Sequence, residues 1–306
     1  MRALIYEGRL HLRHNVPEPI PDIHSALLRI RRAGICNTDL ELTAGLYDFQ
    51  GILGHEFTGE VVTGPDMWLG KRVVGEINVT CGHCDFCQRG IPSQCRSRAA
   101  VGIHNYPGAF ADYLSLPIRN LHRVPEAISD DQAVFAEPLA AALQILEAVH
   151  ISPRDRVIVL GIGKLGMLVA QILKLTGADV IGVVRYEKQA RLLENWGVSA
   201  AHYADLEPQR AQVVVDCTGQ PSGFSDALSL VESRGGLILK STYQGLPSID
   251  LTQIASREIH VIGSRCGPFD AALRLLQAGL VDVESMIEAR FSFEDALAAF
   301  ERAAQA

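Results

Sequence analysis

The chain has no long uninterrupted run of apolar residues. Nowhere in its 306 residues do roughly 18–20 apolar residues follow one another, which is the length that a membrane-spanning helix needs. The start of the sequence, residues 1–6, also lacks the architecture of a signal peptide. We therefore expect no membrane partner and a cytoplasmic location.

The chain also lacks an excess of positive charge. It has 28 Lys and Arg residues against 35 Asp and Glu residues, a formal net charge of −7 and a pI near 5.8. Nucleic-acid binding draws its affinity from clustered Lys and Arg residues, and the group Arg29, Arg31 and Arg32 is too small to provide it. We expect a small-molecule substrate and no nucleic-acid partner.

No internal repeat or low-complexity segment is present, and the length favours two domains because single hydrophobic cores stop growing near roughly 250–300 residues. Short alternating runs broken by Gly and Pro predict an antiparallel β domain in the first quarter of the chain, at residues 26–30, 59–62 and 71–74. An Ala- and Leu-rich helix is then expected over residues 133–149.

Beyond that helix, strand-like and helical runs alternate, and this alternation is typical of a parallel sheet. The expected strands are residues 156–160, 180–184, 213–217, 237–240 and 259–262, and helical segments follow the first four. Two amphipathic helices are expected near residues 271–278 and 293–304, separated by an extended run near residues 286–291.

The first of these strands runs directly into a glycine-rich turn, Gly161-Ile-Gly163-Lys164-Leu165-Gly166, and then into an apolar helix. Gly161 permits the tight turn, Gly163 lets backbone N–H groups approach a pyrophosphate, and Gly166 lets the helix pack close to the strand. A glycine triplet alone is equally consistent with a flexible turn. The strand-to-helix context favours a dinucleotide site, with the positive end of the helix facing the anion.

The end of the second strand indicates which dinucleotide binds. A ribose-binding acid is expected about 20 residues after the glycine turn, but the strand ends in Arg185-Tyr186 and the first carboxylate is Glu187. Arg185 can pair with a 2′-phosphate, and Tyr186 can stack on adenine. We therefore favour NADP over NAD, with a solvated loop cation as the alternative interpretation of Arg185.

Four of the seven cysteines, Cys81, Cys84, Cys87 and Cys95, lie on one short loop. In a long chain without a signal peptide, this clustering indicates metal rather than disulfides. Four thiolates can close a tetrahedron around Zn²⁺ and leave no open position, so this zinc would be structural. An iron–sulfur run would have three residues before its last cysteine and a proline after it, whereas here the gap is seven and Arg96 follows.

Two further motifs, Gly34-Ile-Cys36-Asn-Thr38-Asp39 and Gly54-His55-Glu56, precede the cysteine loop. Together with the glycine turn, and in this order, the motifs closely resemble the zinc-containing medium-chain dehydrogenase/reductase family over essentially the whole chain. The resemblance implies a GroES-like antiparallel β catalytic domain over residues 1–125 with a structural zinc lobe at 81–95. It also implies a Rossmann NAD(P)-binding domain over 126–265, a return to the first domain over 266–306, and a homodimer or homotetramer.

In that family the Cys and His of the two motifs bind a catalytic zinc, which carries over to Cys36 and His55. The segment that supplies the third ligand reads Ala136-Glu137-Pro138, similar to the sorbitol, threonine and glucose dehydrogenase branch, so Glu137 is the expected ligand and Glu56 the alternative. Pro138 suits the first position of a helix, which would place Glu137 at the N-cap, where the helix dipole keeps a carboxylate ionised.

Three protein ligands leave the fourth zinc position for substrate, and zinc lowers the pKa of a bound hydroxyl. The resemblance makes Thr38 the first carrier of the hydroxyl proton, although a helix cap is the ordinary role of such a residue. Asp39 would orient a zinc ligand. Many family members have a histidine where this chain has Glu41, which leaves the outer proton path open. Thr218 and Arg265 resemble segments that approach the cofactor.

The sequence therefore predicts a zinc-dependent, NAD(P)-linked enzyme that interconverts an alcohol, with a secondary alcohol or polyol favoured, and its ketone or aldehyde. Tyr47 and Phe49 are candidate substrate-facing aromatic residues, with core packing as the alternative. Two other functions stay open at this point. One is a catalytically silent dinucleotide-binding sensor, and the other is a metal-free quinone or enone reductase.

Overall fold

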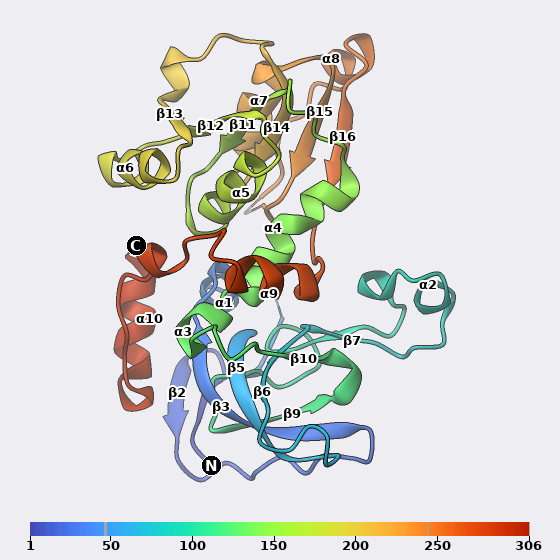
Figure 1. Cartoon of the computed structure of the whole chain (residues 1–306), viewed down its shortest axis with the longest axis vertical. Helices are drawn as coiled ribbons and strands as arrows, with labels where there is room; N and C mark the ends of the chain where they lie inside the picture. Colours follow the sequence, from blue (N-terminus) through green and yellow to red (C-terminus); the bar gives the residue numbers. More distant parts are fainter. Residues whose placement is uncertain (46–47, 244, 306) are drawn as a thin grey trace. The chain divides into compact units, whose positions relative to one another are not determined.

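The computed structural model describes residues 1–45, 48–243 and 245–305 (Figure 1). The chain divides into two units, of which the first comprises residues 1–137, 272–278 and 287–306 and the second comprises residues 138–271 and 279–286. The division falls within one helix, after Glu137. The first unit therefore includes residues 126–137, which the sequence analysis assigns to the dinucleotide-binding domain.

The first unit is built on antiparallel β-structure, as expected from its alternating pattern (Figure 1). Its main sheet has five strands in the order β10-β6-β5-β3-β9, with bounds Leu121–Arg123, Arg72–Gly75, Glu56–Thr63, Ser25–Gly34 and Tyr113–Pro117. Leu28, Phe57 and Val73 project from three of these strands into one buried cluster. Because alternate residues of a strand face the same side, this apolar face fixes the strand register.

Smaller elements complete the first unit. One sheet contains β2 (Leu10–Arg13), β1 (Ala3–Tyr6) and β4 (Gly51–Ile52), and another pairs β7 (Asn78–Val79) with β8 (Ala99–Ala100). The helices are α1 (Asn37–Thr43), α2 (Asp85–Gln88), α3 (Asp130–Ala133) and α10 (Ala296–Ala304). Short 3₁₀ turns span Pro92–Gln94, Ile118–Asn120 and Phe293–Asp295.

The second unit contains a six-stranded, fully parallel sheet in the order β13-β12-β11-β14-β15-β16. The strands, in that order, are Ser199–Ala201, Asp179–Val183, Arg156–Leu160, Ala211–Asp216, Val231–Leu239 and His260–Gly263. Its central strands are continuous apolar runs because helices cover both faces of such sheets. The predicted fold class, a Rossmann sheet joined to an antiparallel β domain, is confirmed, although the short strand β13 carries no pattern that predicts it.

The helices of the second unit follow its strands as predicted, except for one that precedes the first strand. They are α4 (Ala136–Ala148), α5 (Lys164–Lys174), α6 (Glu187–Asn195), α7 (Pro221–Leu230), α8 (Leu251–Ser256) and α9 (Phe269–Gln277), of which α4 and α9 are shared with the first unit, with a 3₁₀ turn each at Tyr203–Asp205 and Glu284–Met286. Among the described residues no helix is both long and apolar enough to cross a membrane.

Two details at the start of α4 differ from the predictions. The helix expected over residues 133–149 is present as Ala136–Ala148, and a capping box of Ser129 and Gln132 starts a separate short helix, α3, ahead of it. Helix α4 begins at Ala136, so Glu137 lies in the first turn and not at the N-cap. Pro138 is tolerated there because the first N–H groups of a helix have no partner within it. The extended run expected near residues 286–291 begins in the 3₁₀ turn Glu284–Met286 and otherwise lies outside any helix or strand.

Glycines allow α5 to pack against the end of β11. A Cβ added at Gly166 would lie 2.1 Å from the carbonyl oxygen of Gly161, so any side chain there displaces backbone. Gly161 has a φ of +83°, which other residues rarely adopt. At Gly163, by contrast, an added Cβ meets nothing within 4 Å. Packing therefore requires glycine at positions 161 and 166, and leaves open space beside position 163.

We expect Gly166→Ala to lower the free energy of unfolding by about 1–3 kcal/mol, because overpacking at a backbone contact outweighs the gain in helix propensity. Urea denaturation followed by circular dichroism measures this change. Gly163→Ala is the matched control and should leave stability nearly unchanged. Equal destabilisation by the two substitutions would show that the close approach of α5 and β11 is not what Gly166 provides.

Candidate active site and dinucleotide-binding loops

The register of the main sheet of the first unit brings two of the sequence motifs together. Gly34, the last residue of β3, pairs with Glu56, the first residue of β5. Cys36 then follows β3 as the N-cap of α1, and His55 precedes β5. Gly34 has no side chain, and a Cβ there would lie 2.8 Å from Oε2 of Glu56, so the glycine makes room for this carboxylate.

The Cys36 sulfur, a ring nitrogen of His55 and a carboxylate oxygen of Glu56 all lie within 4.8 Å of one another. His55 is only 3% exposed, and the other two residues are half-buried. A thiol, an imidazole and a carboxylate form a mixed sulfur, nitrogen and oxygen donor set. Zinc is commonly bound by donors of these three types.

Asp39 holds this group of donors in place. Its carboxylate is fully buried and accepts hydrogen bonds from the backbone N–H of Cys36 at 2.9 Å and from that of Gly54 at 3.2 Å. The Asp39 Oδ1 atom also lies 3.4 Å from Nδ1 of His55, which is buried and has no hydrogen bond. The expected orienting role of Asp39 thus has a geometric basis, because one carboxylate contacts both motifs.

The neighbouring segment at residues 108–110 supports the same loop. The N–H groups of Ala109 and Phe110 donate to the carbonyls of Gly54 and Leu53 at 2.8 and 2.9 Å. A Cβ at Gly108 would lie 2.2 Å from the Leu53 carbonyl oxygen, so this segment approaches as closely as glycine allows. The backbone that presents His55 is therefore hydrogen-bonded on a second side.

The charges of the site shift the pKa values of its members. Burial, opposed by His55 and reinforced by the carboxylates of Glu137 and Asp39, raises the pKa of Glu56 to about 7. Burial and the Glu56 carboxylate raise the pKa of the Cys36 thiol. Burial lowers the pKa of His55, but the Asp39 carboxylate outweighs it and the net pKa lies well above the ordinary value. The three donors therefore favour their protonated forms, and a bound cation would take the place of these protons.

The other predicted residues of this site have different positions. Glu137 is half-buried and acts on Glu56 by charge, but the set of mutually close donors contains Glu56 and not Glu137. The Oγ1 atom of Thr38 lies 3.9 Å from the Cys36 sulfur. Glu41 is buried. The metal-binding and catalytic roles of these residues stay predictions.

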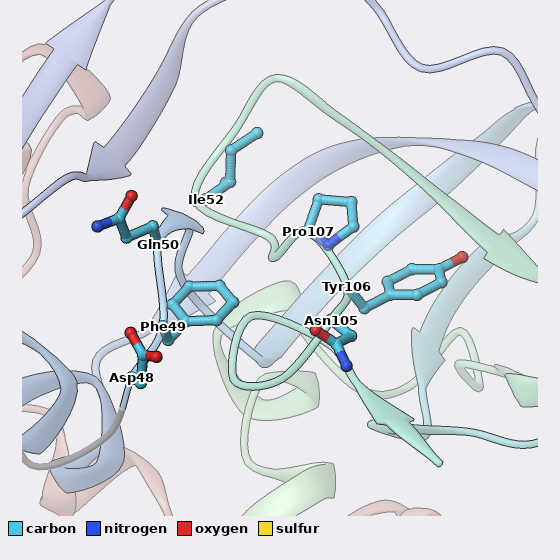
Figure 2. A pocket seen from close by; sticks show the side chains of 8 residues that line it. Asp48, Phe49, Gln50, Ile52, Asn105, Tyr106 and Pro107 are labelled. Atoms are coloured by element: carbon cyan, nitrogen blue, oxygen red, sulfur yellow. The ribbon is translucent and has the colours of Figure 1, made fainter. Parts of the chain in front are cut away.

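A pocket of about 390 Å³ opens beside the loop that leads to His55 (Figure 2). Two neighbouring segments, residues 48–52 and 105–107, line it, with Phe49, Tyr106 and Pro107 shown as sticks in Figure 2. Phe49 is largely buried and belongs to an apolar cluster, which confirms core packing, and it also lines the pocket, while its contact with substrate stays a prediction. Tyr47 lies outside the described residues.

The four-cysteine lobe has the dimensions of a tetrahedral metal site. The Sγ atoms of Cys84 and Cys87 lie 3.5 Å apart, those of Cys84 and Cys95 3.9 Å apart, and those of Cys95 and Cys81 3.5 Å apart. Disulfide sulfurs lie about 2 Å apart. A zinc tetrahedron with bonds of about 2.3 Å has edges of about 3.8 Å, which these distances match. Backbone N–H groups of Arg96 and Cys87 lower the pKa of Cys84 and favour its thiolate.

In the second unit, the glycine turn and the loop after β12 lie at the carboxyl ends of adjacent parallel strands. Gly163 is the N-cap of α5, and Lys164 and Leu165 form its first turn. Arg185 and Tyr186 follow β12, and both side chains are exposed. The carboxyl ends of such strands are where dinucleotides bind. The predicted residues therefore share one edge of one sheet.

Two polar residues outside the predicted set organise the remaining loops of this edge. Asp216 is fully buried and accepts hydrogen bonds from the backbone N–H and the hydroxyl of Thr218, at 2.8 and 2.7 Å. The buried ammonium of Lys240 donates to the Arg265 carbonyl at 2.8 Å. The side chain of Arg265 is exposed. Strand-end position is the signal that could have identified Asp216 and Lys240.

Comparisons with known families match both units. Residues 22–126 match the alcohol dehydrogenase GroES-like domain, and residues 165–278 match the zinc-binding dehydrogenase domain. An L-threonine 3-dehydrogenase from Escherichia fergusonii is 30% identical over 307 residues, covering 92% of this chain and 89% of that protein. The chain belongs to the zinc-containing medium-chain dehydrogenase/reductase family. As a medium-chain dehydrogenase/reductase, it is an oxidoreductase that acts on CH–OH groups with a nicotinamide dinucleotide.

Other dehydrogenases are also similar to this chain over most of its length. D-arabinitol dehydrogenase 1 from Uromyces fabae is 29% identical over 309 residues, which cover 90% of this chain and 86% of that protein. A solved structure of a candidate zinc-binding dehydrogenase from Sinorhizobium meliloti, bound to NADP, has a TM-score of 0.90 and 29% identity. It covers 98% of this chain and 94% of its own.

We expect Asp39→Asn to lower the free energy of unfolding of the metal-free chain by about 1–3 kcal/mol. The amide can accept only one of the two backbone N–H groups and leaves the other buried without a partner. Urea denaturation measures the change. Asp48→Asn, at an exposed position of the same unit, is the control, and a similar small effect of both substitutions would contradict the anchoring role of Asp39.

Proposed function

We propose that this chain is a zinc-dependent dehydrogenase of secondary alcohols or polyols that prefers NADP. The observation that carries the proposal is the convergence of Cys36, His55 and Glu56 beside the buried carboxylate of Asp39. Isolated residues of these types usually have structural roles. Three different donor types within 4.8 Å of one another, next to a buried carboxylate that orients them, are instead the arrangement of an open metal site.

The donors fit a catalytic zinc. We propose Cys36, His55 and Glu56 as the ligands, in place of Glu137, because these three already lie together. We propose that Glu137 acts on Glu56 by its charge and exchanges with Glu56 as a zinc ligand. When bound, zinc supplies Lewis acidity that makes a substrate hydroxyl easier to deprotonate. Three protein ligands leave one position for that hydroxyl.

The protein side chains around the donors have separate proposed tasks. Thr38, beside the Cys36 sulfur, takes the substrate hydroxyl proton first, because its own hydroxyl can accept one proton and donate another. Asp39 holds the imidazole orientation and keeps Cys36 and Gly54 at a fixed spacing. Burial of His55 and Asp39 excludes water from that side of the site and strengthens each electrostatic contact.

The second zinc is proposed to be structural. Its four sulfur ligands leave no open coordination position, so it can stabilise the lobe but cannot bind substrate. Arg96 pairs with Asp85 at 2.6 Å and lies over the Phe86 ring, which ties the chain after Cys95 to helix α2. These contacts brace the lobe around its cysteines.

The preference for NADP rests on Arg185 and Tyr186. No carboxylate ends β12 to accept a ribose hydroxyl or repel a phosphate, and the exposed guanidinium can pair with a 2′-phosphate. The open space beside Gly163 and the N-terminus of α5 suit the pyrophosphate. The related structure from Sinorhizobium meliloti with bound NADP supports this choice.

The substrate class rests on the relatives and on the pocket beside the His55 loop. The relatives act on D-arabinitol and on L-threonine, which both carry a secondary hydroxyl. The pocket has carboxylate and amide groups from Asp48, Gln50 and Asn105 as well as the Phe49 ring. Such a mixture can hydrogen-bond several hydroxyls of one substrate.

We expect about two zinc ions per chain and turnover with secondary alcohols or polyols in a panel that also contains sugars and amino alcohols. Glu56→Gln should lose the catalytic zinc and lower turnover by about 100-fold or more, whereas Glu137→Gln, the matched control, should retain both zinc ions. Elemental analysis and steady-state rates measure these effects. Cofactor binding without any turnover, or chelator-insensitive reduction of enones, would contradict the proposal.

We expect Arg185→Asp to weaken NADP binding about 10- to 100-fold and to strengthen NAD binding, because the substitution removes a phosphate partner and adds a ribose acceptor. Fluorescence titration of the two reduced cofactors gives the two dissociation constants. Arg210→Asp, at another exposed arginine of the same unit, is the control. An unchanged ratio of the two constants would remove the basis of the NADP assignment.

A further inference from the structure

The side chain of Gln189 joins the two loops to which the proposed function assigns the cofactor. Its Oε1 atom accepts hydrogen bonds from the backbone N–H groups of Arg185 at 2.9 Å and Tyr186 at 3.2 Å. Its Nε2 atom donates to the carbonyl oxygen of Ile162 at 2.7 Å. Ile162 is the residue between Gly161 and Gly163, so one amide spans from the glycine turn to the loop after β12.

Helix capping accounts for only half of these contacts. Gln189 is the third residue of α6, and a side chain at that position commonly accepts N–H groups just before the helix. An oxygen alone is sufficient for that purpose. The bond from Nε2 to Ile162 reaches a different strand-to-helix turn and adds nothing to the cap. A residue at this position needs both an acceptor and a donor to make all three bonds.

Strand β12 also packs tightly against helix α6 and the glycine turn. A Cβ added at Gly182 in β12 would lie 2.4 Å from Cδ1 of Leu193 and 3.0 Å from Cδ1 of Ile162. The backbone of Arg185 and Tyr186 is fixed by Gln189, while both side chains remain exposed. The loop after β12 is therefore held at its backbone and free at the groups that would meet a ligand.

We propose that Gln189 is a positioning residue that sets the spacing between the pyrophosphate turn and the Arg185–Tyr186 loop. The inference rests on the proposed dinucleotide site and deepens it. A dinucleotide bridges the two loops, so its affinity depends on their spacing before binding, whereas a fragment that meets one loop does not depend on it. Gln189 needs no contact with the cofactor to have this effect.

The test compares a ligand that spans both loops with one that meets a single loop. Gln189→Met keeps the length of the side chain and removes its hydrogen bonds. We expect its dissociation constant for NADP to rise about tenfold, as the loss of up to three hydrogen bonds implies, and that for adenosine 2′-monophosphate to change by less than about twofold. Calorimetric titration of the full chain measures both constants without turnover.

The matched control is Gln212→Met. Gln212 also joins neighbouring segments, since it accepts from the Arg156 N–H at 2.7 Å and donates to Glu232 at 2.8 Å, but it lies in β14 beside the start of β11, at the sheet edge opposite the glycine turn. This substitution should leave both dissociation constants unchanged even where it lowers the melting temperature. Gln189→Asn, whose shorter amide cannot span both loops, should behave as Gln189→Met and is the variant to use if the methionine chain does not fold.

Equal weakening of both ligands, or of neither, by the Gln189 substitutions would overturn the positioning role while leaving the dinucleotide site intact. Absence of NADP and NAD binding by the unaltered chain would overturn the proposed function together with this inference. The two failures are therefore distinguishable in one set of titrations.

Discussion

The buried carboxylate of Asp39 is the constraint on which the candidate active site depends. Two motifs that are separate in the sequence meet on it, because it accepts the N–H of Cys36 and the N–H of Gly54 and faces the imidazole of His55. An ionised carboxylate is costly to bury unless donors surround it. The loops are therefore held by the same contacts that stabilise the charge, and the donor atoms are brought close together by the protein itself.

In the second unit, polar side chains likewise hold the backbone of the loops that carry the candidate ligand-binding residues. Here the candidate cofactor edge is made of loops whose backbone is held by polar side chains: half-buried Gln189 for the loop after β12, buried Asp216 for Thr218, and buried Lys240 for Arg265. The groups that would meet a cofactor stay exposed. In both units the residues that position are more buried than the residues that bind, which is how a prearranged site avoids the cost of ordering when its ligand arrives.

Much of this arrangement could be predicted from the sequence where a physical signal is local. Backbone geometry and ligand spacing dictate the glycine turn, the strand before it and the four-cysteine loop, so their positions could be predicted from the sequence. The start of α4 could not be predicted as well, since a proline is tolerated anywhere in the first turn of a helix. Strand β13 has only three residues and no apolar pattern.

The long-range contacts could not be predicted from the sequence. Nothing in the local pattern shows that Gly34 pairs with Glu56, yet that register decides which carboxylate lies beside Cys36. The role of Gln189 could not be predicted either, because its sequence position indicates only the first turn of a helix and not its contact with Ile162. Tertiary register, and not residue type, separates Glu56 from Glu137 as the nearer carboxylate.

The central claim is that Cys36, His55 and Glu56 form one preassembled metal site. Anomalous diffraction at the zinc absorption edge, on crystals of the zinc-loaded chain, tests it most directly. We expect one peak within bonding distance of the Cys36 sulfur, a His55 nitrogen and a Glu56 oxygen, in addition to a peak among the four cysteines. A peak among the cysteines alone, or a second peak bonded elsewhere, would contradict it.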